Sequence, residues 1–564
     1  KTIGTSYYRP ILAISFILDA QEGGTQPWIY HRTNVVLHVL GSLMVFYFLI
    51  MLGYNRIVSF SMGILFAFHP ILTPAACWIS GRNDSLITVF ILIFFITLAA
   101  FYRTAKWYKW LFLLFNLIAY TLSLYTKEIA AMLPFVAFIY ILWYRKEKPF
   151  IFKNILITLF WFFIGLVWWS MRSKALEGIK NPDTIGFDAL IKNFPTVPAM
   201  IGKIILPVKM IALSSFEWFS IASGIVFIIA IGLYIYFSKT IDKPKALFGV
   251  AWFVTFLFPT LMVRIVYVDD FFDYAEHRAY LAMVGIVIIL IEIFKAFKID
   301  FKKPIPIIAI ALVFITLTVR SNVYVPKFED RKKFWTQMVD MYPYKSRGYL
   351  DLGKAYFSEQ KFKEAEKLYI KGVERNPNNF NLYIDLAAIA SNEKNWVKAD
   401  KFARKAVQLD PTNVLGNYHL ANSLVQRNMN QEALQYFETA NNNNVKFPHI
   451  PFELGLVYYK LKEYDKAVQV FNRTLSMNPQ FAEAYSYLGA IFALRKQFEN
   501  AEVCLNNAIS IKPDLLDPHY NLINLYLFQK KFTEAGRAAA AFRKINPNLP
   551  PQLKDALDKA GVKY

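Results

Sequence analysis

Cysteine and charge are both scarce in this sequence, and each shortage excludes a class of protein. Cys77 and Cys504 are the only two cysteines among 564 residues, so we expect neither a disulfide nor a cysteine-based metal site. Charged side chains make up 18% of the chain and hydrophobic side chains 55%. This composition is too apolar for an ordinary soluble protein.

The few charges are unevenly distributed along the chain. Residues 1–320 contain 29 Lys and Arg and 16 Asp and Glu, whereas the shorter remainder contains 34 and 25. A membrane part is therefore joined to a water-soluble part. The formal net charge of +22 would suit nucleic acid, but the basic residues stand in short clusters between apolar runs, as they do in membrane proteins. We therefore expect membrane lipids as partners and no nucleic acid.

Ten apolar runs in residues 1–320 are long enough to cross a bilayer as helices. Lipid offers the backbone no hydrogen-bond partner, so each span must be a helix of about 20 apolar residues. A further apolar stretch, 195–213, is interrupted by prolines and lysines, and we predict a re-entrant or interfacial segment there. The ten predicted spans are 33–53, 57–77, 84–102, 108–126, 129–144, 152–171, 221–237, 247–265, 279–297 and 304–320.

Loop charges assign a side to each end of these spans, since short loops rich in Lys and Arg stay in the cytoplasm. With ten alternating spans, one set of loops carries 15 basic and 3 acidic residues, whereas the opposite set carries 10 of each. The first set is therefore predicted to be cytoplasmic. The N-terminal segment and everything after residue 320 are then external. Because no Met and no signal peptide open the sequence, we expect the chain to lack its start, and an earlier span would make eleven.

A repeat of 34 residues organises the second part of the chain. Leu and Ala each recur at one position of every period, and this period is that of the tetratricopeptide repeat (TPR), in which small residues let paired helices approach closely. We predict a connecting helix within 321–345, six repeats over 346–549 and a capping helix within 550–564. The recurring residues are Pro343, Pro377, Pro411, Pro479, Pro513 and Pro547, with Val445 at the one vacancy; Leu352, Leu386, Leu420, Leu454, Leu488 and Leu522; and Ala365, Ala399, Ala433, Ala467, Ala501 and Ala535.

A TPR array is a binding surface that performs no chemistry itself. Four polar side chains are predicted to face its concave groove: Lys354, Asn422, Asn521 and Asn524. No run of Lys and Asn suits a C-terminal carboxylate, so no peptide motif can be named. A spacer or scaffold is the equally weighted alternative. The fold class predicted for the whole chain is all-α, a polytopic membrane helical domain followed by a TPR α-solenoid.

Polar residues cluster in the external loops of the membrane part, where they are costly and therefore candidates for function. Two pairs have a purely structural alternative, in which they are interfacial charge pairs that cap helices: Arg82 with Asp84, and Lys127 with Glu128. His38 is expected to bridge two spans, and the proline after His69 is expected to bend its helix. The acidic residues Asp269, Asp270 and Asp273 form either a divalent-cation site or a solvated loop, and we favour the solvated loop. No cofactor is otherwise indicated.

An ordered series of motifs resembles one family, the transmembrane and TPR-containing O-mannosyltransferases. The series is Tyr8-Arg9-Pro10, then His31, Asn34 and His38, then Phe68-His69-Pro70 and the run 78–84, then Lys127-Glu128, then Glu276, Arg278 and Tyr280, followed by TPRs. The resemblance implies a GT-C type glycosyltransferase fold of about eleven spans. It also implies a polyprenyl-phosphate sugar as donor and Ser or Thr of a protein as acceptor.

The resemblance assigns roles residue by residue. Arg9, Arg82, Lys127 and Arg278 are candidates to bind the donor phosphate, Asp84, Glu128 and Glu276 to organise them, and His69 to shape the site. The family carries its acidic catalytic motif before the Tyr-Arg-Pro run, where this sequence has not yet begun, so no catalytic base is assigned. His277 within the Glu-to-Arg motif, and Ala282 where the family often has Pro, are further departures.

The function predicted from these patterns is transfer of mannose or another hexose to an acceptor protein on the external face, with the TPRs binding the acceptor. A bacterial inner membrane with periplasmic TPRs is expected, or an endoplasmic-reticulum membrane with lumenal TPRs in a eukaryote. Two alternatives stay open: a ligase or polymerase for lipid-linked glycans, and a membrane-anchored TPR scaffold without catalysis.

Overall fold

The structure is a computed structural model, and it describes residues 8–145, 152–177, 186–263, 274–296, 304–443 and 447–564. The chain divides into two compact units, Lys1–Gly348 and Tyr349–Tyr564. In the described ranges both are helical, apart from one two-stranded antiparallel pair in the first unit, β1 (Leu213–Ser214) with β2 (Tyr274–Ala275). The all-α fold class is therefore confirmed.

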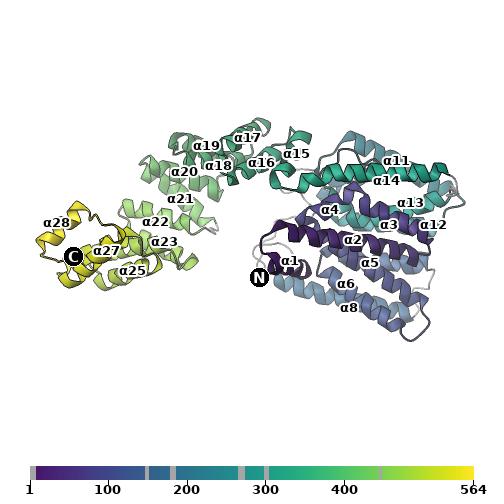
Figure 1. Cartoon of the computed structure of the whole chain (residues 1–564), viewed down its shortest axis with the longest axis horizontal. Helices are drawn as coiled ribbons and strands as arrows, with labels where there is room; N and C mark the ends of the chain where they lie inside the picture. The colour runs from purple at the N-terminus through teal and green to yellow at the C-terminus, as the bar shows by residue number, and fades with distance from the viewer. Residues whose placement is uncertain (1–7, 146–151, 178–185, 264–273, 297–303, 444–446) are drawn as a thin grey trace. The chain divides into compact units, whose positions relative to one another are not determined.

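Helices cover every predicted span of the first unit, and several lie side by side, among them α2, α5, α6 and α8 (Figure 1). The spans correspond to α2 (Pro27–Met51), α3 (Arg56–Phe68) with η1 (Pro70–Leu72) and α4 (Thr73–Cys77), α5 (Arg82–Arg103), α6 (Lys109–Leu124), η3 (Glu128–Met132) with α7 (Leu133–Ile139) and η4 (Tyr140–Tyr144), α8 (Phe152–Ala175), α11 (Trp218–Phe237), α12 (Lys243–Leu261), α13 (Ala279–Ala296) and α14 (Pro304–Tyr324).

Seven of these helices are long and apolar enough to cross a membrane, and the chain is an integral membrane protein. The second predicted span is bent by 54° between α3 and the segment Pro70–Cys77, as expected from its proline. Two other predicted spans, Lys109–Leu124 and Glu128–Trp143, are shorter apolar helices. The total of ten spans therefore stays a prediction.

The stretch predicted to be re-entrant or interfacial contains a short helix, α10 (Thr196–Ile205). Its 10 residues extend roughly 15 Å, about half of the bilayer's hydrocarbon thickness. Gly202 and Gly224 let α10 pack closely against α11, because a Cβ on either glycine would overlap backbone atoms of the other helix. The remaining elements of the unit are α1 (Pro10–Gly23), η2 (Ile79–Gly81), α9 (Phe187–Asn193), η5 (Glu276–Arg278), η6 (Val325–Phe328) and α15 (Arg331–Met341).

Among the described residues, several contacts join loops that charge counting placed in the same set. In one set Arg9 contacts Glu128 and Lys127 contacts Asp84. In the other set Lys245 Nζ donates to the carbonyl of Leu52 at 3.2 Å, and Arg145 Nη2 donates to the carbonyl of Tyr102 at 3.3 Å. The loops that charge counting grouped together are therefore neighbours in space.

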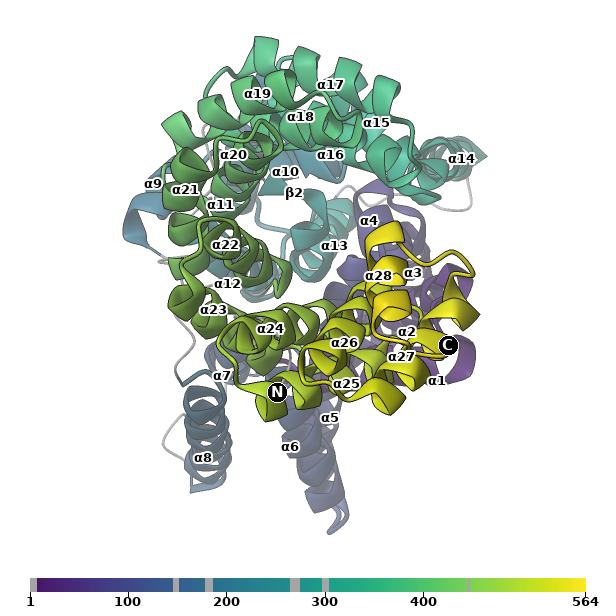
Figure 2. The same ribbon diagram turned by 90° about the vertical axis from the view of Figure 1, so that its left-hand side faces the viewer.

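The second unit contains the predicted helix pairs and the predicted final helix, α28 (Pro551–Lys559). The first helices of the pairs follow the inner side of an arc and the second helices its outer side (Figure 2). The first helices are α16 (Ser346–Ser358), α18 (Phe380–Asn392), α20 (Val414–Gln426), α22 (His449–Lys460), α24 (Ala482–Leu494) and α26 (Leu516–Phe528); the second are α17 (Phe362–Arg375), α19 (Trp396–Leu409), α21 (Asn430–Asn442), α23 (Tyr464–Met477), α25 (Phe498–Ile511) and α27 (Phe532–Ile545).

Recurring residues hold these pairs together in the predicted way. The six recurring alanines, from Ala365 to Ala535, are all fully buried. Two positions after each first helix ends, a residue other than glycine has positive φ, between 56° and 62°: Gln360, Lys394, Asn428, Lys462, Lys496 and Lys530. The next residue's N–H bonds back to a carbonyl five positions earlier, as Asn395 does to Ala390 at 2.9 Å, which is the Schellman pattern.

Candidate functional site

Three titratable side chains from separate loops meet at one end of the membrane unit. Lys127 Nζ lies 2.5 Å from Oδ1 of Asp84, and His277 Nε2 lies 3.8 Å from Oδ2 of the same carboxylate. Oδ2 of Asp84 and Nδ1 of His277 are buried and have no hydrogen-bond partner among the described residues. An unsatisfied buried acceptor beside a cation is costly unless a ligand or a proton completes it.

These side chains converge because each begins or ends a helix. Asp84 lies in the first turn of α5, where a carboxylate is favoured by the helix dipole. Lys127 follows α6 and caps η3, and His277 lies in η5 just before α13. Trp78 lies beside this group, with its ring centroid 5.4 Å from that of His277.

A second charged pair lies next to the first. Arg9 binds Glu128 with both Nε and Nη2, at 3.1 and 2.6 Å from Oε2, so the pair is fork-shaped and directional. Glu128 adjoins Lys127 in the chain, and Arg278 acts electrostatically on His277 together with Lys127 and Asp84. Arg9, Asp84, Lys127, Glu128 and Arg278, which the sequence grouped as one site, therefore form one neighbourhood.

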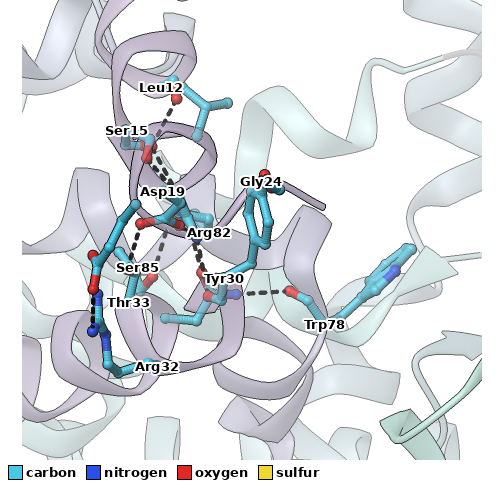
Figure 3. A network of polar contacts seen from close by, with 12 residues as sticks. Leu12, Ser15, Asp19, Gly24, Tyr30, Arg32, Thr33, Trp78, Arg82 and Ser85 are labelled. Atoms are coloured by element: carbon cyan, nitrogen blue, oxygen red, sulfur yellow. Dashed lines mark hydrogen bonds and ion pairs between the residues drawn. The ribbon is translucent and has the colours of Figure 1, made fainter. Parts of the chain in front are cut away.

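Arg82 is surrounded by acceptors inside the protein (Figure 3). Its Nε donates to Asn34 Oδ1 at 2.8 Å, its Nη1 to the carbonyl and hydroxyl of Ser15, and its Nη2 to Asp19 and to the carbonyl of Tyr30 at 3.0 Å. The side chain is 0% exposed. An Arg side chain has five N–H groups, and all five are accounted for here.

These contacts occupy the N–H groups of the Arg82 guanidinium and tie α1 and α2 to the start of α5. The contact with a donor phosphate that the sequence suggested for Arg82 stays a prediction. Asp84 and Arg82 lie two residues apart, so this anchor also fixes the helix start that presents Asp84. Asp19 also accepts a hydrogen bond from Thr33 at 2.7 Å.

Glu276 belongs to a different cluster from the one predicted for it. Its Oε1 lies 2.7 Å from Lys203 Nζ and 3.0 Å from Ser214 Oγ, and its Oε2 accepts from the backbone of Ile211 at 3.2 Å. Both charged side chains are 0% exposed. Glu276 therefore joins α10, β1 and η5. These contacts hold the fold next to the site together, and none of them is made to an arginine of the site.

His69 and His38, to which the sequence assigned roles in shaping the site and in bridging spans, are both engaged. His69 Nε2 donates to the carbonyl of Ile204 at 2.7 Å, and its Nδ1 accepts from the backbone of Ile71 at 3.2 Å, which fits a role in shaping the bend. His38 bridges spans as expected, because its Nε2 lies 2.9 Å from the carbonyl of Ala67 and its Nδ1 2.7 Å from the hydroxyl of Tyr280.

Metal ligation finds no support in the part of the chain that the structure describes. There, no group of three or more His, Cys, Asp or Glu side chains is arranged to hold a metal ion. The acidic residues Asp269, Asp270 and Asp273, for which a divalent cation was the alternative, lie outside the described residues.

The four groove candidates all lie on first helices of the TPR pairs, which form the inner side of the arc. Lys354 Nζ lies 3.8 Å from Asp385 of the next repeat. Burial raises the pKa of Asp385 to about 6. Asn422 and Asn521 are half-buried, and Asn524 is exposed. Lys354 therefore joins two repeats.

Asp19, Lys203 and Ser214 are the residues that sequence reasoning missed. Lys203 was detectable as a lone charge within an apolar helix, and Asp19 as a charge that follows an apolar run, and either is expensive when buried without a partner. Their partners are 63 and 73 positions away in the chain, and no local pattern connects them.

The fold and the site define an integral membrane protein with a charged cluster at one end of its helices and a TPR array. The residues 346–379 match the family model for the tetratricopeptide repeat, and residues 455–494 match a second TPR model. Similar folds include the solved structures titled "YrrB: a TPR protein with an unusual peptide-binding site" (24% identity, TM-score 0.31, 34% of this chain and 98% of that chain) and "MamA protein" (24%, 0.28, 30% and 92%).

The likeness to the TMTC O-mannosyl-transferases is confirmed over part of the chain. Protein O-mannosyl-transferase TMTC2 of Homo sapiens is 40% identical over 87 residues, which is 15% of this chain and 10% of the human protein. Protein O-mannosyl-transferase TMTC1 of Mus musculus is 36% identical over 91 residues, which is 16% of this chain and 10% of the mouse protein. The matched region thus spans about a tenth of the length of these relatives.

Proposed function

We propose that the membrane unit is a glycosyltransferase that moves a hexose from a polyprenyl phosphate to Ser or Thr of an acceptor protein. The observation that carries this proposal is the convergence of Lys127, Asp84 and His277 with the Arg9–Glu128 pair. The names of the relatives support O-mannosylation, and mannose is therefore the first sugar to test.

The charges of the cluster suit a phosphate that becomes a leaving group. Arg9, Lys127 and Arg278 supply cations, and Asp84 and Glu128 hold two of them in defined positions. Preorganised cations stabilise negative charge as it develops on the departing phosphate.

The reaction that we propose inverts the sugar. The acceptor hydroxyl attacks the anomeric carbon, the bond from that carbon to the phosphate oxygen breaks, and the phosphate leaves with the electron pair. A general base takes the hydroxyl proton, and we assign none of the described residues to that role. The unsatisfied Oδ2 of Asp84 is suited to orient a sugar or acceptor hydroxyl.

Sidedness and compartment are part of the proposal. The end that bears the cluster would face the compartment in which such donors are presented, and the basic loops at the other end would face the cytoplasm. A bacterial periplasm, or an endoplasmic-reticulum lumen in a eukaryote, fits this orientation. The TPR array would bind the acceptor chain in the same compartment.

Transfer of a radiolabelled hexose from its polyprenyl phosphate to a Ser- and Thr-containing peptide, by the full chain in lipid nanodiscs, tests the proposal. We expect Lys127→Met to lower the rate by about a hundredfold or more, the loss typical when one stabilising group is removed. Lys106→Met, an exposed lysine at the opposite end, is the matched control and should leave the rate unchanged. Equal rates for both variants would contradict the assigned role.

The alternatives differ in their product. A ligase or polymerase of lipid-linked glycans would add a long chain, whereas the proposed enzyme adds one hexose, so the mass of the product separates them. A scaffold would discharge no donor at all.

A further inference from the structure

The TPR array contains a cavity of about 370 Å³ between its fourth and fifth repeats. It lies at the start of α22 and α24, the first helices of these repeats, which belong to the inner side of the arc (Figure 2). This volume is in the range of sites that bind small molecules or side chains. The cavity is lined by His449, Phe452, Glu453, Asn478, Gln480, Phe481 and Glu483.

Aromatic rings form one side of the cavity. The rings of Phe452 and Phe481 lie 4.8 Å apart between centroids, and the ring of His449 meets that of Phe481 edge-on at 5.2 Å. Tyr487 of α24 lies 6.0 Å from Phe452. Aromatic faces attract cations and also pack against the aliphatic stem of Lys or Arg.

Glu453 is the charged group beside these rings. Burial raises the pKa of the Glu453 carboxyl, while His449 and Lys460 act electrostatically in the opposite direction. Within the described part of the array, no Lys or Arg lies within ion-pair distance of Glu453, and no hydrogen bond to its carboxylate is present. A half-buried carboxylate without a partner favours a cation brought by a ligand.

The second carboxylate of the cavity behaves differently. Glu483 accepts from Lys512, which follows α25 in the same repeat, at 3.1 Å, so its charge is already compensated. Other carboxylates of the array are paired across repeats, as Glu366 is with Lys398 at 2.5 Å and Glu432 with Arg404 at 2.7 Å. Glu453 is therefore the carboxylate of this cavity that a cationic ligand would complete.

We propose that this cavity receives a Lys or Arg side chain of the acceptor protein, with Glu453 as its counter-ion and Phe452 and Phe481 against its stem. This inference rests on the proposed function, in which the array binds the acceptor, and it names the class of acceptor segment: one with a basic residue near the Ser or Thr that is modified. The amide side chains of Asn478 and Gln480 border the same cavity and suit contacts with a peptide backbone.

Peptide binding to the full chain in nanodiscs tests this inference. The probes are two fluorescein-labelled Gly/Ser/Thr peptides that are identical except for a central Lys or norleucine. We expect the Lys peptide to bind about tenfold more tightly, and we expect Glu453→Gln to abolish the difference. Glu364→Gln, an exposed carboxylate on the outer helix α17, is the matched control and should retain the difference.

Equal binding of the two peptides to the unaltered chain would overturn the inference, and so would a preference that survives in Glu453→Gln. Glu453→Asp keeps the charge and is expected to retain part of the preference, which separates loss of the counter-ion from local unfolding. Hexose transfer to a saturating amount of the norleucine peptide should be unchanged in Glu453→Gln. An inactive protein that still prefers the Lys peptide would therefore contradict only the proposed enzyme, and an active protein without the preference only this inference.

Discussion

The buried ion pairs of the membrane unit differ from the ion pairs of the array in how far water reaches them. In the membrane unit Lys203 and Glu276 are both 0% exposed, as is Arg82, whereas in the array the side chains of Lys398 and Glu366 are 30% and 20% exposed. A buried charge that loses its partner is left in a medium of low polarity, whereas an exposed one is solvated. The pairs of the membrane unit should therefore govern its stability, and those of the array should not.

Removing Lys203 should give the largest effect. Lys203→Met leaves the carboxylate of Glu276 buried without its cation, and we expect a loss of about 3–5 kcal/mol in unfolding free energy. Thermal unfolding of the purified chain in detergent measures it. Adding Glu276→Gln should restore part of the loss, because the unpaired charge is removed as well. Lys333→Met, whose pair with Glu329 is exposed, is the control, and an equal loss there would contradict the comparison.

A pH dependence of the array should be intermediate in size. The pKa of Asp385 rises from 3.8 to about 6 because the carboxyl is buried. Between these values the folded array holds a proton that the unfolded chain has released, so this group's contribution to stability is lost as pH rises through about 6. Asp385→Asn should therefore stabilise the array at pH 8 by an amount on the order of 2 kcal/mol.

Unfolding of the array at pH 5 and at pH 8, followed by limited proteolysis, measures this difference. The exposed Asp514→Asn is the control and should be neutral at both values. If Asp385→Asn instead destabilised the array at pH 8, the contact of Asp385 with Lys354 would outweigh the cost of burying its carboxylate.

The smallest effect is expected for an exposed pair of the array. Lys398→Met removes its contact with Glu366, and we expect a change of about 0–1 kcal/mol in unfolding free energy, decreasing with added salt. Thermal unfolding at low and high ionic strength measures it. A loss comparable with that of Lys203→Met would remove the distinction between the two units.

The array could be predicted from sequence in detail because its information is local and repeated. The recurring Leu and Ala positions located both helices of each pair, and the second helices begin at residues 34 apart, from Phe362 to Phe532. The left-handed turn residues were not predicted, because glycine is the usual indicator of positive φ and here Lys, Asn or Gln occupies that position.

The membrane unit was predictable in outline only. Hydropathy located its helices, and loop charge grouped its ends correctly. The partners of Arg82 and Glu276 were not predictable, because long-range pairing is decided by packing between helices and leaves no periodic trace. Arg82 and Lys127 have the same type of charge and similar surroundings in sequence, yet the structure makes one an anchor and the other a half-buried member of the candidate site.

The glycine-free turns of the array have an evolutionary consequence. Their backbone shape recurs with three different residue types, so the side chain at this corner is not what sets the shape. Mutations at these turns can therefore change the charge and chemistry of the surface of the array. The curvature of the array and the spacing of its inner helices would stay the same.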